Sequence, residues 1–169
     1  MKLKAFTAAL MLAALPVAAL TLAGCSGGDA TATTPDAVAL KVALTIKSLN
    51  GKHDFVVETA KTEQEQQRGL MYRTDIPANA GMLFAPYPPS GPPREASFWM
   101  KNTPSPLDII FIRADGTIAR IAENTTPFSE TPIPSGEPVA AVLEINGGRS
   151  AELGISEGDV VTWPGHGKG

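Results

Sequence analysis

Cysteine and histidine are scarce in this chain. Cys25 is its only cysteine, and His53 and His166 are its only histidines, among 169 residues. A single cysteine excludes an internal disulfide, and two histidines far apart in the sequence do not make the ligand set of a zinc site. His53 lies beside a predicted turn and His166 in the C-terminal tail, settings that do not suit a Ser-His-Asp triad. These absences predict a protein without a metal or cofactor.

Positive charge is also in short supply. The chain has 14 basic and 17 acidic residues, which gives a net charge of −3. If the N-terminal segment with Lys2 and Lys4 is removed, 12 basic residues remain against 17 acidic ones, and the charge becomes about −5. Nucleic-acid binding depends on clustered positive charge, so this balance argues against a nucleic-acid partner.

The first 25 residues form a segment with its own pattern of charge and hydropathy. Lys2 and Lys4 precede an apolar stretch, Ala5 to Leu20, and the tetrad Leu22-Ala23-Gly24-Cys25 follows. This order is typical of an export signal, here with a cleavage site that ends in a lipid-accepting cysteine. We predict that residues 1–24 are removed and that acyl chains on Cys25 anchor the protein in a lipid membrane. A membrane-spanning helix is the alternative, but the segment is short for one.

The residues after Cys25 predict a tether and one folded domain. Ser26 to Asp36 is rich in Ser, Gly, Thr and Ala, a composition that buries little apolar area. We therefore divide the chain into a signal peptide (1–24), a lipidated flexible tether (25–37), one domain (38–164) and a frayed tail (165–169).

Short apolar segments with alternating or continuous hydrophobicity dominate the domain. Strands are predicted over residues 41–46, 55–57, 81–84, 97–101, 109–113, 117–122, 139–145 and 160–163. Thr62 and Glu65 form a capping box for the one short helix, which ends near Gly69, and residues 149–153 are expected to add a helical turn. Long loops rich in Pro and Gly, above all Tyr87 to Pro93, separate these elements. The pattern predicts a mainly β protein, a small single-domain sandwich or barrel.

Several motifs resemble those of the domain of unknown function 192 (DUF192) family. They are Arg68-Gly69-Leu70-Met71, Gly81-Met82-Leu83-Phe84, Phe98 to Thr103, Pro106 to Ile109, and Leu143-Glu144 with Gly147-Gly148. The resemblance covers about residues 56–163. It implies a compact β-rich domain with a jelly-roll-like or barrel-like sheet, and it implies no activity.

Polar residues in and around the motif Phe98 to Thr103 are the candidates for ligand binding. On a strand, Trp99 and Lys101 would share one face and present an aromatic surface beside a cation. Asn102 follows at the strand end, and Arg68 and Asp108 add charged groups. These five residues predict a site for a polar ligand such as a glycan or a cell-wall fragment, with an envelope protein as another possible partner. The structural alternative is that Lys101 or Arg68 pairs with Asp108 or Glu144, fixes the register of the strands and ties loops down.

Two acidic residues in apolar surroundings suggest a further alternative. Asp108 and Glu144 each follow a leucine inside a predicted strand, where a charge is costly. Two carboxyl groups with separated pKa values could serve as acid and base in glycoside cleavage. A copper site at Met71, Met82 and Met100 is a remoter alternative, because methionines in such places usually fill the core.

Together these observations predict an exported, lipid-anchored envelope protein whose domain is a non-catalytic binding or accessory module. The alternative is a carbohydrate-active hydrolase that uses Asp108 and Glu144. Ser26 rather than an aspartate follows Cys25. By analogy with lipoprotein sorting, this predicts the periplasmic face of the outer membrane if the organism has two membranes, and otherwise the outer face of the cell membrane.

Overall fold

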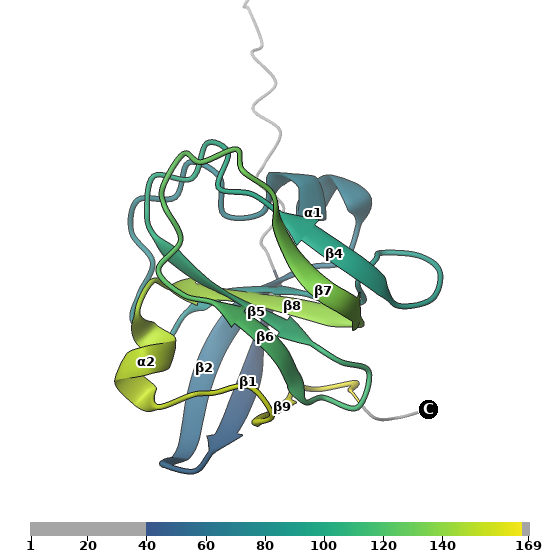
Figure 1. Ribbon diagram of the computed structural model, residues 1–169, viewed down its shortest axis with the longest axis vertical. Helices are drawn as coiled ribbons and strands as arrows, with labels where there is room; N and C mark the ends of the chain where they lie inside the picture. Colours follow the sequence, from purple (N-terminus) through teal and green to yellow (C-terminus); the bar gives the residue numbers. More distant parts are fainter. Residues whose placement is uncertain (1–39, 167–169) are drawn as a thin grey trace, which may run out of the picture. The chain divides into compact units, whose positions relative to one another are not determined.

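The computed structural model describes residues 40–166 of the chain (Figure 1). The predicted signal peptide, Cys25 and the tether to residue 37 lie outside the described residues. Within the described range, no helix combines the length and the apolar character needed to cross a membrane.

The described residues form a mainly β domain with two short helices, which confirms the predicted fold class. In chain order the elements are β1 (Lys41–Ser48), β2 (Gly51–Ala60), α1 (Glu63–Arg68), β3 (Gly81–Phe84), β4 (Arg94–Phe98), β5 (Leu107–Ile112), β6 (Ile118–Ala122), β7 (Ile133–Val139), β8 (Ala141–Asn146), α2 (Arg149–Leu153) and β9 (Val160–Thr162).

Seven of these strands form a nearly closed barrel. Their order is β6-β5-β8-β3-β2-β1-β9, and β4 and β7 form a separate two-stranded sheet. The pair β2–β3 is parallel and the other pairs of the large sheet are antiparallel. The two edges meet at a bridge between Thr117 and Val160, where Ile118 N–H donates to Asp159 O at 2.9 Å. Closure of this kind removes exposed strand edges.

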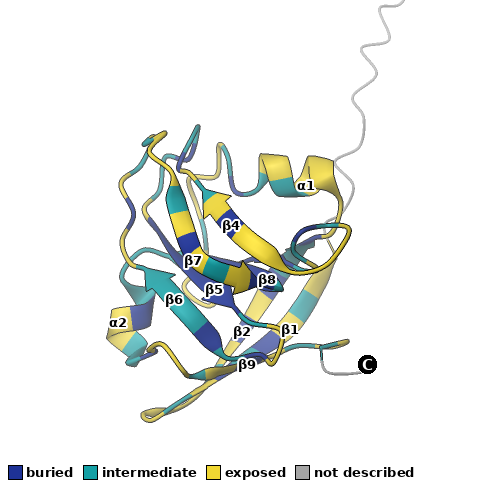
Figure 2. Ribbon diagram, turned by 45° about the vertical axis from the view of Figure 1, so that its right-hand side comes forward, coloured by how far each residue is buried: buried dark blue, intermediate teal, exposed yellow. Residues whose placement is uncertain are grey.

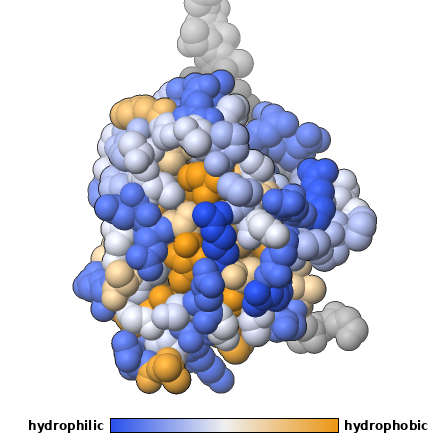
Figure 3. Space-filling model, viewed as in Figure 1, coloured by the Kyte–Doolittle hydropathy of each residue, from blue (hydrophilic) through white to orange (hydrophobic). Residues whose placement is uncertain are grey.

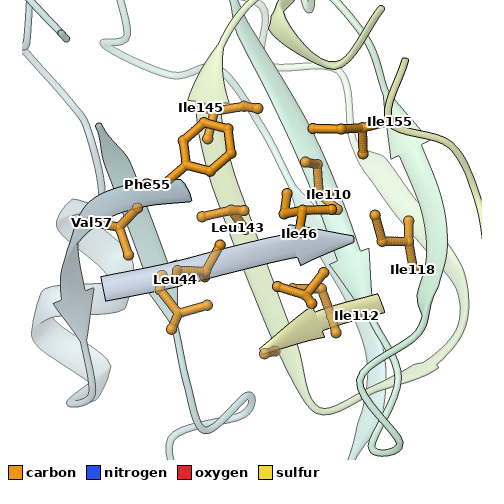
Figure 4. Close-up of a cluster of buried hydrophobic side chains, with 13 residues drawn as sticks. Leu44, Ile46, Phe55, Val57, Ile110, Ile112, Ile118, Leu143, Ile145 and Ile155 are labelled. Atoms are coloured by element: carbon orange, nitrogen blue, oxygen red, sulfur yellow. The ribbon is translucent and has the colours of Figure 1, made fainter. Parts of the chain in front are cut away.

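The barrel interior holds the first hydrophobic core. Alternate residues of its strands point inward because successive side chains on a strand lie on opposite faces. Figure 4 shows Leu44, Ile46, Phe55, Leu143 and Ile145 converging in this space, together with side chains from β5 and β6.

A second core lies on the outer face of β3, β5 and β8, beneath β4 and β7. It contains the buried residues Ala60, Leu70, Met82, Phe84, Ala96, Met100, Leu107, Ile109, Phe111, Val139 and Val142. Figure 2 shows β5 and β8 buried behind the more exposed strands β4 and β7. In Figure 3, apolar side chains are visible in the middle of the face that carries β5, β6 and β7, between hydrophilic ones. With a core on each side, all six residues of β5 are buried.

Two expectations about strands were wrong. The strand expected over 97–101 is β4 at Arg94–Phe98, so Trp99 and Lys101 follow the strand instead of alternating along it. Strand β7 was not predicted, because Pro134, Gly136 and Pro138 lie within it. Proline removes a backbone donor, and it is tolerated here because β7 pairs with β4 alone in a two-stranded sheet.

The C-terminal stretch expected to fray is described as far as His166. His166 N–H donates to Trp163 O at 3.2 Å, and the two rings stack with their centroids 4.1 Å apart. These contacts hold the first residues of the tail against the domain.

Candidate functional site

An open pocket of about 810 Å³ lies between α1, the Tyr87–Ser90 loop, the end of β4 and the segment that follows β4. This volume is in the range of small-molecule sites, roughly 300–1,000 Å³. Its lining residues are Glu63, Gln66, Gln67, Arg68, Gly69, Leu70, Met71, Phe84, Tyr87, Pro88, Pro89, Ser90, Arg94, Ser97, Phe98, Trp99, Lys101, Asn102, Thr103 and Glu144. Four of the five predicted ligand-binding residues are among them: Arg68, Trp99, Lys101 and Asn102.

Helix α1 forms one wall of the pocket, and its ends are well defined. The Thr62 hydroxyl accepts a hydrogen bond from Glu65 N–H, and the Glu65 carboxylate accepts one from Thr62 N–H, which completes the predicted capping box. Gln66 donates to the carbonyl oxygens of Ala60 at 3.1 Å and Pro86 at 2.8 Å. These bonds tie the helix to both β2 and the proline-rich loop.

The segment after β4 places the predicted aromatic and basic side chains. Met100 is buried in the second core and its N–H donates to Ser129 O at 2.8 Å, which anchors the segment. On either side, Trp99 remains 46% exposed and the Lys101 ammonium lies 4.8 Å from the centre of its indole ring. The sequence therefore placed Trp99 and Lys101 together correctly, but through a turn around Met100 rather than through strand alternation.

Asn102 adopts an uncommon backbone conformation in the same segment. Its φ is 53°, in the left-handed region, where asparagine is one of the more tolerant residues. Its carbonyl accepts from Tyr72 N–H at 2.8 Å, and its side-chain amide lies 3.9 Å from Met71 sulfur. Asn102 thus links the segment after β4 to the chain that leaves α1.

Aromatic side chains also line the pocket. Phe98 stacks edge-on against Phe84, with ring centroids 5.1 Å apart, and lies 5.7 Å from Tyr87. The proline-rich loop, expected from the sequence to separate two strands, contributes Tyr87 to this cluster. The pocket therefore combines apolar ring faces with charged and amide groups, as sugar-binding and cofactor-binding sites commonly do.

Glu144 lies in the pocket lining and is 5% exposed. It stands on the outer face of β8, directly opposite Met82 of β3 and Ile109 of β5, both of which are apolar and buried. Within residues 40–166 the structure gives its carboxyl group no hydrogen bond or ion pair. Burial without a compensating partner raises the pKa of Glu144 from 4.5 to about 8, so the group is mostly a neutral acid at pH 7.

Asp108 has a different environment and does not line the pocket. It is completely buried, and its carboxylate accepts three backbone N–H groups, from Asn124, Gly148 and Ser150, each at 2.7 Å. Three such donors satisfy a buried carboxylate. Asp108 thereby ties the loop after β6 and the start of α2 to β5. It fastens loops, as the structural alternative expected of the buried acids, but through backbone donors instead of a Lys or Arg side chain.

The structure does not bring Asp108 and Glu144 together. In the β5–β8 register Asp108 is opposite Ile145 and Ile109 is opposite Glu144. Directly opposed residues share a face, so the two acids point to opposite sides of the sheet. Two carboxyl groups that hydrolyse a glycoside must flank one scissile bond, which this arrangement does not provide.

Several lining residues were not predicted from the sequence, chiefly Arg94, Tyr87 and the glutamine-rich face of α1. Arg94 begins a strand and Gln66 and Gln67 lie on an exposed helix, positions where polar residues are ordinary. No local signal distinguished them. The described part of the chain contains no group of three or more His, Cys, Asp or Glu side chains close enough to hold a metal ion.

Fold and site together define a small, nearly closed β-barrel domain with an open pocket on the outside of the barrel. The profile of the DUF192 family, described as "Uncharacterized ACR", matches residues 45–163. The chain belongs to this family.

Solved structures agree with this assignment. A protein of unknown function from Novosphingobium aromaticivorans DSM 12444 is 46% identical, with a TM-score of 0.71, over 76% of this chain and 89% of that chain. A protein of Sinorhizobium meliloti 1021, whose description suggests a transcription regulator, is 43% identical, with a TM-score of 0.69, over 74% of this chain and 95% of that chain. No curated protein sequence matches the chain significantly.

Proposed function

We propose that this domain is a non-catalytic binding module of the bacterial cell envelope and that its pocket takes a polar, sugar-like ligand. The observation that carries the proposal is the convergence of Trp99, Lys101, Asn102 and Arg68, from two separate segments, on one pocket of about 810 Å³. An exposed indole can stack on the apolar face of a sugar ring. The amide and the cations supply directional hydrogen bonds to hydroxyl or acidic groups.

Binding can be tested with the folded domain alone. Residues 40–166 contain both hydrophobic cores and all strands of the sheet, so a chain that starts at Pro35 retains the domain. Thermal unfolding would be measured against a panel of mono- and oligosaccharides and peptidoglycan fragments. A ligand at a hundred times its dissociation constant stabilises a domain by about 2.7 kcal/mol, which raises the midpoint by several degrees.

A variant at Trp99 makes the test specific to the pocket. For Trp99→Ala we expect affinity for any hit to fall roughly tenfold, because a stacking surface is lost, with little change in stability. Phe128→Ala is the matched control, since Phe128 is an exposed aromatic residue that is not part of the lining. Equal losses in both variants, or a panel without any hit, would contradict the proposal.

The envelope location rests on the N-terminal sequence. Lys2, Lys4, the apolar stretch and the tetrad ending in Cys25 support lipidation of Cys25 after removal of residues 1–24. In cells given labelled palmitate, the full-length protein should carry the label and fractionate with membranes. Cys25→Ser should abolish both the label and the membrane fractionation. If the wild-type protein carries no label and keeps residues 1–24 uncleaved, the lipoprotein assignment is refuted.

A further inference from the structure

The pocket is positively charged on an acidic protein. Arg68, Arg94 and Lys101 line it, against Glu63 and Glu144, whereas the whole chain carries −3. Because Glu144 is mostly protonated at pH 7, Arg94 and Lys101 alone outnumber the one lining carboxylate, that of Glu63. A surface of this sign attracts anionic ligands and raises their local concentration.

Arg94 and Lys101 form no ion pair with a carboxylate of residues 40–166. The Lys101 ammonium is placed over the Trp99 ring, and the structure gives Arg94 no ion pair with any described carboxylate. They come from different segments, the first residue of β4 and the turn after it, yet both line the same pocket. A guanidinium in the lining, together with an ammonium beside an aromatic ring, suits a ligand that carries both a carboxylate and a sugar ring.

Glu144 adds a buried polar group that the fold itself does not use. More than nine-tenths of its surface is covered, its strand neighbours Met82 and Ile109 are apolar, and the residue lines the pocket with no hydrogen bond or ion pair to another of residues 40–166. A buried polar group of this kind is costly to leave without a hydrogen bond. A neutral carboxyl group can donate its proton to a ligand oxygen.

From this geometry we infer that the ligand is an acidic sugar, whose carboxylate is held by Arg94 and Lys101 and one of whose oxygens forms a hydrogen bond with the Glu144 carboxyl group. The inference rests on the proposed function and narrows it from polar sugars to carboxylated ones.

Matched pairs of sugars test the inference directly. Glucuronic acid against glucose and galacturonic acid against galactose differ by a carboxylate in place of a hydroxymethyl group. N-acetylmuramic acid differs from N-acetylglucosamine by a lactyl ether that carries the carboxylate. Titration calorimetry at pH 7 and low salt should give at least one acidic member with about tenfold or greater preference over its neutral partner. The pair that responds distinguishes a wall-derived acidic sugar, N-acetylmuramic acid, from a uronic acid.

Charge variants connect the preference to the pocket. Arg94→Gln and Lys101→Gln should each lower affinity for the acidic sugar about tenfold and leave affinity for the neutral one nearly unchanged. Lys47→Gln is the control, because it removes one positive charge from an exposed site on β1 that does not line the pocket. Equal binding of both members of every pair would overturn the inference and leave the proposed function standing. Absence of binding by any sugar would overturn both.

The role of Glu144 has its own readout in pH. Charged or titratable groups that line the pocket with it are Glu63 and Arg68 on α1, Arg94 on β4, Lys101 after β4 and Tyr87 in the proline-rich loop. Between pH 7 and 9, loss of the Glu144 proton should weaken acidic-sugar binding about tenfold. Glu144→Gln keeps a neutral donor and should abolish this fall, while titration of other groups affects both proteins alike. If the affinity falls by the same factor in the wild type and in Glu144→Gln, Glu144 does not bind the ligand.

Discussion

At neutral pH the Glu144 carboxyl group holds its proton in the folded protein and loses it when the chain unfolds. Burial raises its pKa to about 8 in the folded state, whereas 4.5 is the ordinary value in an unfolded chain. Between these two values the unfolded state binds one proton fewer. The free energy of unfolding therefore falls as the pH rises. The stability is fully present below pH 4.5 and is lost as the pH approaches the folded-state value.

The size of the effect follows from the same two values. Each pH unit between them costs the folded state about 1.4 kcal/mol, so the interval from 4.5 to about 8 amounts to about 5 kcal/mol. Such a loss is a large part of the stability of a domain, typically about 5–15 kcal/mol. Glutamine has nearly the same shape and stays neutral. Glu144→Gln should therefore match the wild-type stability near pH 4.5 and exceed it by about 3–4 kcal/mol at pH 7.5.

Urea unfolding of both proteins between pH 4.5 and pH 8, followed by circular dichroism, measures this difference. Titration of all other groups is common to the two proteins and cancels when one curve is subtracted from the other. Glu157→Gln, at an exposed glutamate before β9, serves as a control and should show a nearly constant difference from the wild type. A constant difference for Glu144→Gln as well would refute the assignment of a buried, unpartnered carboxyl group.

Three further substitutions test how the fold positions the pocket. Asp108→Asn replaces an acceptor oxygen by an amide donor that faces backbone N–H groups, and it should lower the free energy of unfolding by about 2–4 kcal/mol in chemical denaturation. Gly81→Ala should cost at least about 2 kcal/mol in the same assay, because an added Cβ would overlap the Glu144 backbone carbonyl oxygen. Thr62→Ala should cost about 1 kcal/mol through loss of the α1 cap, whereas Thr62→Ser should retain most of the stability. Wild-type midpoints for any of these three alanine or asparagine variants would contradict the contact assigned to that residue.

Local patterns predicted most of the elements correctly. The capping box at Thr62 and the strand over 81–84 each depend on neighbours within a few residues. Strand β7 was missed because its prolines argue against a strand in general. Only its pairing with β4, in a sheet of two strands, explains why they are tolerated.

The two acids illustrate what the sequence alone could not separate. Asp108 and Glu144 have similar surroundings in the sequence, each beside leucine and isoleucine. The β5–β8 register turns one toward loop N–H groups and the other toward the pocket. Which face a strand residue occupies changes with a shift of one residue in register, so it depends on the assembled sheet.

By itself the sequence determined the β-rich class, the family, and the pairing of Trp99 with Lys101, because these depend on composition and on residues close together in the chain. Only the tertiary structure brought Arg94, the proline-rich loop and α1 to the same pocket. It also left Glu144 buried there with no hydrogen-bond partner in the described part of the chain. Those properties arise between segments far apart in the chain, where contacts follow from how the barrel closes and how β4 and β7 cover it.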